Sequence, residues 1–279
     1  MNAAVRWLTA AMAASAWGCV PTPMSGPSVV AVYPSADRIP ENVLRFYVSF
    51  SAPMREGDFL DHVRLERVDT KEDLTGVFFD NIHELWSSDR RRITLLVDPG
   101  RVKTGLRANL EMGRAFEAGG TYRLRVLETW TSTRGEPLLS EYSHTFQAIA
   151  EDSAPVAPDR WCLIPPAAGS PEPLQVDFGE PVDHVSVHRL LRILDPEDTP
   201  LSGTWTLGPA ERTAAWTPDA PWGAPIGAHT LLISGRFEDV AGNNLNAAFE
   251  HRPQAVPEGR ESTVMRVPLQ RRCAPDEAR

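Results

Sequence analysis

The chain has 279 residues, of which 42% are hydrophobic, and its formal net charge is −9 at pH 7. This length suits about two domains, and the hydrophobic content is sufficient for a buried core in each, which excludes a disordered chain. The acidic balance argues against a nucleic-acid partner, because proteins that bind nucleic acids carry a basic face. The 25 prolines and 19 glycines favour short strands joined by many turns.

The N-terminus predicts an export signal. Residues 7–17 are an apolar stretch that is too short to span a bilayer as a helix but suits the core of a signal peptide. Two cleavage sites compete. Ordinary signal peptidase would cut after Ala16, whereas a lipoprotein signal at residues 1–18 would leave a lipidated Cys19 at the start of a tether, residues 19–28. We favour the lipoprotein, and both interpretations export the chain.

Residues 29–149 are predicted to form a first β domain. Between Leu44 and Phe50 apolar and polar residues alternate, with Arg45, Tyr47 and Ser49 on the polar side, as in a half-buried strand. Similar patterns predict four more strands, at residues 63–68, 93–97, 122–127 and 142–147.

A linker and a second domain follow. Residues 150–173 are rich in proline, alanine and serine, residues 174–252 are predicted to be the second β domain, and residues 253–279 a polar tail. The expected strands of this domain are residues 174–178, 188–194, 231–234 and 248–251. Residues 188–194 also suit one helical turn, and their alignment with the first domain favours a strand.

The two domains are copies of one module. The segment Phe50-Ser51-Ala52-Pro53 matches Phe178-Gly179-Glu180-Pro181, and Leu74-Thr75-Gly76 matches Leu201-Ser202-Gly203. A repeat of this length indicates two similar units, and short alternating strands separated by turns are typical of β-sandwiches. The predicted fold class is therefore all-β, with two tandem Ig-like β-sandwiches after a signal peptide.

Several motifs resemble bacterial Ig-like modules of the S-layer (SbsA) type. They are an opening strand that ends in proline (29–34), an F-S-x-P-M turn (50–54), Gly120-Thr121-Tyr122, and a D-x-A-G-N-x-L hairpin at 239–245. The resemblance implies an Ig-like sandwich in which Tyr122 fastens a loop as a tyrosine corner. Each copy is imperfect, since His229 replaces this tyrosine in the second module and residues 133–136 replace the hairpin signature in the first.

No motif predicts a catalytic, metal or cofactor site. His184 and His188 would share one face of a helix, but no glutamate completes a zinc motif, and a structural role is favoured. The acidic loop at residues 195–198 lacks the ligand spacing of a calcium site. In an exported protein Cys162 and Cys273 are free to form a disulfide, which the sequence leaves open.

One insertion distinguishes the first module from the second. Residues 100–114 have no counterpart in the second copy and combine four cations with exposed leucine and methionine. Loops on a rigid sandwich often carry binding sites. The candidate partner-binding residues, for an acidic glycan or an envelope protein, are Arg101, Lys103, Arg107 and Arg114.

These observations predict a non-enzymatic, exported and lipid-anchored protein with a structural or binding role at the bacterial cell envelope. Its partners would be the membrane, through the lipid, and an envelope protein or glycan. One alternative is a carbohydrate-binding accessory module, which would require Trp205, Trp216 and Trp222 to form an exposed platform. The other is an enzyme of unrecognised type, which would require a deep pocket with converging acid and base groups.

Overall fold

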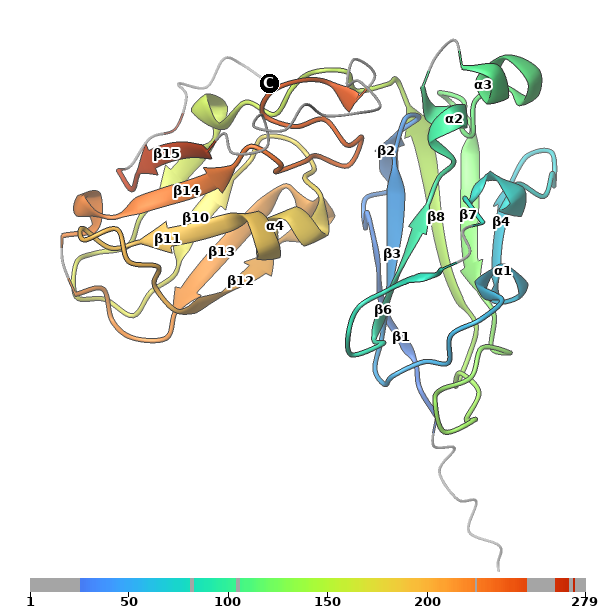
Figure 1. Ribbon diagram of the computed structural model, residues 1–279, viewed down its shortest axis with the longest axis horizontal. Coiled ribbons are helices and arrows are strands. Elements are labelled where there is room, and N and C mark those ends of the chain that lie inside the picture. The colour runs from blue at the N-terminus through green and yellow to red at the C-terminus, as the bar shows by residue number, and fades with distance from the viewer. Residues whose placement is uncertain are drawn as a thin grey trace, which may run out of the picture.

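The computed structural model describes residues 26–80, 83–103, 106–223, 225–249, 264–270 and 273. The described chain is mostly β and forms two sandwiches, each built from two sheets (Figure 1). The predicted signal peptide, Cys19 and most of the tether lie outside the described residues. No helix among the described residues is long and apolar enough to cross a membrane.

Domain 1 packs two four-stranded sheets face to face. The first sheet has the order β1 (Val29–Tyr33), β3 (Arg45–Phe50), β6 (Arg92–Leu96) and β5 (Leu85–Trp86). The second has the order β2 (Arg38–Pro40), β8 (Tyr142–Ile149), β7 (Thr121–Val126) and β4 (Val63–Arg67). All neighbours are antiparallel except β2 and β8.

Domain 2 repeats this arrangement. Its first sheet has the order β9 (Cys162–Ile164), β10 (Leu174–Asp177), β13 (Thr213–Pro218) and β12 (Gly203–Leu207). Its second has the order β11 (Leu191–Leu194), β14 (Thr230–Ser234) and β15 (Val264–Pro268). Strand order matches domain 1 throughout, apart from a counterpart of β2, so the sequence repeat corresponds to a repeated topology.

Short helices connect the strands. Four are α-helical: α1 (Phe59–His62), α2 (Pro99–Val102), α3 (Arg107–Met112) and α4 (His184–Leu190). The 3-10 turns that lie wholly within the described residues are η1 (Thr75–Val77), η2 (Pro158–Arg160), η3 (Pro209–Glu211) and η4 (Ile226–Ala228). The predicted strand at 188–194 is wrong in its first half, because residues 188–190 belong to α4 and only residues 191–194 form a strand. Asp183 caps this helix by accepting a hydrogen bond from the Ser186 backbone N–H at 2.8 Å.

The expected boundaries of the second domain are also corrected. Strand β9 comes from the presumed linker and pairs with β10, while β15 comes from the presumed tail and pairs with β14. Domain 2 therefore needs residues on both sides of 174–252. The reason is topological, since β9 and β15 take the places that β1 and β8 have in domain 1, and each completes a sheet edge. The expected strand at 248–251 is wrong within its described residues, which end at a 3-10 turn.

Each sandwich has its own core. In domain 1 the inward side of β3 is buried as predicted, and Phe46 packs between Phe78, Phe116 and Phe146 at ring-centroid distances of 5.5–6.2 Å. Tyr122 accepts a hydrogen bond from the Glu117 backbone N–H at 2.8 Å, as expected of a tyrosine corner. In domain 2 the core includes Trp161, Phe178 and Phe237, whose rings contact one another.

Candidate functional site

The polar side of β3 does not face solvent, because domain 2 covers it. Tyr47 is only 4% exposed, and its hydroxyl donates a hydrogen bond of 2.6 Å to the Asp183 carboxylate of domain 2. Beside it, the Arg45 guanidinium pairs with Glu238 of domain 2 at 2.5 Å. Two adjacent residues of one strand side thus hold two acids of the other domain, which makes this surface an interdomain contact.

Helix α4 contacts domain 1 through its first residue. The His184 ring stacks on Tyr33 of β1 at a centroid distance of 3.8 Å and touches the His188 ring at 4.9 Å. Burial, together with the neighbouring His188 and Arg92, lowers the pKa of His184 to about 3, so the imidazole is neutral at physiological pH. The two histidines share a helix face as the spacing allowed, and they serve a packing contact.

A third polar contact joins Ser35 of domain 1 to Glu211 of domain 2. The Ser35 backbone N–H and hydroxyl donate to the two carboxylate oxygens of Glu211 at 2.9 Å and 2.6 Å. Glu211 is 1% exposed, and burial raises its pKa. Its backbone has a φ of +53°, a left-handed conformation that is sparsely populated by non-glycine residues and is retained where surrounding contacts hold it.

The predicted hairpin at residues 239–245 touches domain 1. The Val240 carbonyl accepts a hydrogen bond from the Leu44 backbone N–H at 3.1 Å. Gly242 has a φ of +83°, and a Cβ at this position would lie 2.7 Å from the Leu44 side chain. Glycine therefore serves two purposes here, the tight turn and the close approach of domain 1.

The linker is clamped between the domains at Asp152. Its backbone carbonyl accepts hydrogen bonds from the side-chain amides of Asn42 in domain 1, at 2.7 Å, and Asn243 in domain 2, at 3.0 Å. Its backbone N–H donates in turn to the Asn42 amide oxygen at 2.9 Å. A single linker residue therefore connects both sandwiches through fixed hydrogen bonds, which restricts their relative motion.

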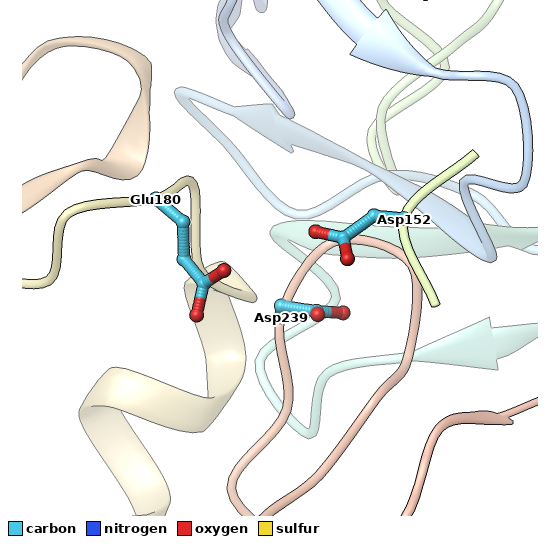
Figure 2. A group of neighbouring side chains, drawn as sticks. All are labelled: Asp152, Glu180 and Asp239. Carbon is cyan, nitrogen blue, oxygen red and sulfur yellow. The ribbon is translucent and has the colours of Figure 1, made fainter. Parts of the chain in front are cut away.

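Three carboxylates meet at this clamp. Oxygens of Asp152, Glu180 and Asp239 lie within 4.8 Å of one another, and they come from three separate segments (Figure 2). Burial, together with the nearby Asp152 charge, raises the pKa of Asp239 to about 8 and that of Glu180 to about 7. Such a group shares protons or attracts a cation, although three carboxylates supply fewer oxygens than calcium takes. We call it the junction carboxylate cluster.

The cations of the 100–114 insertion are engaged within the molecule. Arg101 donates to backbone carbonyls of the loop itself, and Arg107 pairs with Glu111 one turn later. Arg114 bridges Glu41 and Glu151, and the Lys103 ammonium lies 4.7 Å from the ring centre of Phe249 in domain 2. Two of the four predicted partner-binding residues therefore brace the junction, while Leu110 and Met112 on α3 remain exposed.

Other sequence-based expectations have clear positions. Trp205, Trp216 and Trp222 are at most 7% exposed and pack in the domain 2 core, so the aromatic platform of the carbohydrate-binding alternative is wrong. Cys162 and Cys273 form a disulfide. In the acidic loop, Asp195 accepts backbone N–H groups of its own turn, which is ordinary turn chemistry.

Sequence reasoning missed the junction carboxylate cluster. Glu180 and Asp239 each stand in a motif that the sequence singled out, one in the repeated turn and one in the hairpin. Nothing in their spacing indicates that they meet, and Asp152 lies in a segment with no motif. Their approach depends on how the two domains pack.

Comparisons with known proteins give distant likenesses. No protein-family model and no curated protein sequence matches the chain. The S-layer protein rSbsC(31-844) aligns with 75% of this chain at 10% identity and a TM-score of 0.32, and this chain spans only 23% of that protein. Native alpha-2-macroglobulin from Escherichia coli, spanning domains MG0-NIE-MG1, aligns with 74% of this chain and 65% of its own, at 11% identity and a TM-score of 0.29.

Proposed function

We propose that the chain is a non-enzymatic structural protein of the bacterial cell envelope, in which two Ig-like sandwiches are held as a fixed corner. The observation that carries this proposal is the junction, where Tyr47, Asn42 and Arg45 of domain 1 bind domain 2 or the linker through specific polar contacts. Domains on a free linker would leave such groups hydrated. The cavity beside Tyr33 at this interface measures about 10 Å³, room for about one water molecule, which suits a packed contact better than a substrate site.

One feature supports an extracytoplasmic location, and another suggests how the chain would be oriented. The Cys162–Cys273 disulfide is of the kind that persists in oxidising compartments. Strand β1 begins at the end of domain 1 opposite the junction (Figure 1), so a lipid on Cys19 would leave the corner facing away from the membrane. In this arrangement domain 1 separates domain 2 from the membrane, and the junction holds domain 2 at a fixed angle to domain 1.

Small-angle X-ray scattering of the purified chain at pH 6 tests the corner. One arrangement of the two sandwiches should fit the data, and a broad ensemble of interdomain angles would refute the proposal. The double variant Arg45→Met, Tyr47→Phe removes two of the contacts and should broaden the distribution. The control is Tyr142→Phe, on β8, which changes a half-buried tyrosine whose hydroxyl makes no hydrogen bond to a described residue. This variant should leave the distribution of interdomain angles unchanged.

Replacing Cys19 by alanine tests the lipid anchor. The variant should move from the membrane fraction to the soluble exported fraction of the cell, because a lipidated N-terminal cysteine is the proposed attachment. Ser25→Ala is the matched control, since it changes the same tether but keeps Cys19 and should leave the protein with the membrane. Unchanged fractionation of Cys19→Ala would show that the chain is held by other means.

A further inference from the structure

The junction carboxylate cluster occupies the seam of the proposed corner. Asp152 belongs to the linker, Glu180 to the turn after β10, and Asp239 to the base of the 239–245 hairpin (Figure 2). Asp239 is 2% exposed, and its two oxygens accept hydrogen bonds from the Asn243 backbone and side-chain amide at 2.9 Å and 2.8 Å. Three carboxyl groups at this separation cannot all ionise without strong mutual repulsion.

The same residues hold the two domains together, so the ionisation of the cluster affects the stability of the interdomain contact. Asp152 accepts from Asn42 and Asn243 through its carbonyl, while its side chain faces the other two acids. Asp239 begins the hairpin that contacts Leu44 of domain 1. Repulsion within the cluster would therefore push the linker away from the hairpin, and with it one domain from the other.

The surrounding charges do not neutralise the cluster. Arg160 and Arg212 lower the pKa of Glu180, but burial and Asp152 outweigh them. Across the interface, Arg45 is committed to Glu238, and Arg114 to Glu41 and Glu151. Tyr47 of β3 donates to Asp183.

Two other titratable groups at the interface, the histidine pair of α4 and Glu211, differ from the cluster. His184 and His188 have lowered pKa values and stay uncharged above neutral pH, so they do not titrate in the same range. Burial and the nearby Asp183 charge raise the pKa of Glu211, but its two hydrogen bonds from Ser35 favour the ionised form and oppose that rise. The cluster differs from Glu211 because it brings together carboxyl groups of three segments, one of which is the linker.

We propose that the junction is a proton-gated hinge: protons held by Glu180 and Asp239, beside the Asp152 side chain, keep the corner closed, and their loss releases domain 2 from the linker. This inference rests on the proposed corner and adds its regulation. Exposed carboxyls titrate near pH 4. Because the closed junction keeps its protons up to about pH 7–8, its stability is greatest below about pH 4 and is lost as the pH rises through 7–8.

Small-angle X-ray scattering measured from pH 5 to pH 9.5 tests the hinge. EDTA is present to remove divalent metal ions, which could otherwise bind the carboxylates in place of protons. The radius of gyration of the native chain should rise with a midpoint between about pH 7 and 8, while far-ultraviolet circular dichroism stays constant. Glu180→Gln should shift or weaken this transition, and Glu180→Gln with Asp239→Asn should abolish it. Asp219→Asn makes the same charge change at an exposed turn and should behave as the native chain does.

Each outcome has a distinct meaning. A chain that is mobile at every pH refutes the corner itself. A chain that stays closed from pH 5 to 9.5 leaves the corner standing and overturns the gating. A transition that persists in both Glu180→Gln and the double variant also overturns it, because the titrating group would then lie elsewhere. If the double variant fails to fold, Glu180→Gln alone decides, since Glu180 is half-buried and makes no hydrogen bond recorded among the described residues.

Discussion

Reduction of the Cys162–Cys273 disulfide is expected to lower the free energy of unfolding of domain 2 by about 2–5 kcal/mol. The bond closes a long loop, because the two cysteines are 111 positions apart in the sequence. It also joins an outer strand of one sheet, β9, to the segment that follows β15, an outer strand of the other sheet. Without the disulfide, β9 and β15 would be free to detach from their sheets.

The measurement is chemical denaturation with and without a reductant, repeated on the Cys162→Ser, Cys273→Ser variant. Domain 1 is an internal control, since no cysteine lies between residues 29 and 149. The transition of domain 1 should keep its midpoint while that of domain 2 moves to lower denaturant. Equal curves under both conditions would show that packing alone retains β9 and β15.

Asn243→Ala is expected to cost about 2–4 kcal/mol and to loosen the junction. The side chain is 1% exposed, and its amide donates to Asp239 and to the Asp152 carbonyl while its oxygen accepts from the Phe249 backbone N–H at 2.9 Å. Truncation leaves a buried carboxylate oxygen and a backbone N–H without these partners, and such desolvated groups are costly.

Asn246→Ala is the matched control for this variant. Asn246 lies just after the same hairpin but is exposed, and among the described residues its side-chain amide makes one long contact, of 3.5 Å, with the Gly235 carbonyl. Its truncation should change stability by less than about 0.5 kcal/mol. If the two alanine variants unfold alike, the hydrogen bonds of Asn243 are not what holds the hairpin against the linker.

The sequence predicted most strands of domain 1 and fewer features of domain 2. Alternation between Leu44 and Phe50 is a local signal, because one buried face imposes a period of two on any strand. The strand β9 is too short to show this period, and β15 lies in a stretch of mixed polarity. Pairing with β10 and β14 determines both, and pairing between distant segments leaves no local trace.

The polar side of β3 shows why a correct strand prediction still misplaces a surface. Arg45 and Tyr47 occupy the outward positions that the alternation indicates, and a single sandwich would expose them. Domain 2 covers them because Asp183 and Glu238 supply partners for a hydroxyl and a guanidinium. The pattern of one strand carries no information about a second domain.

The insertion at 100–114 was the segment expected to carry the specific role of this protein. The number of cations in a segment says nothing about which carbonyls or carboxylates lie within their reach. In the structure Arg114 and Lys103 face the junction, so the insertion contributes to the interdomain contact.

By itself, the sequence determined the repeat, the all-β class and the turn chemistry of the 239–245 hairpin, because periodicity and glycine conformation act over a few residues. Only the tertiary structure decided that this hairpin meets the linker and that Asp152, Glu180 and Asp239 share one seam. The physical reason is that these contacts form between whole domains. Their partners are set by the packing of two completed sandwiches, and the electrostatics of the seam follows from that burial.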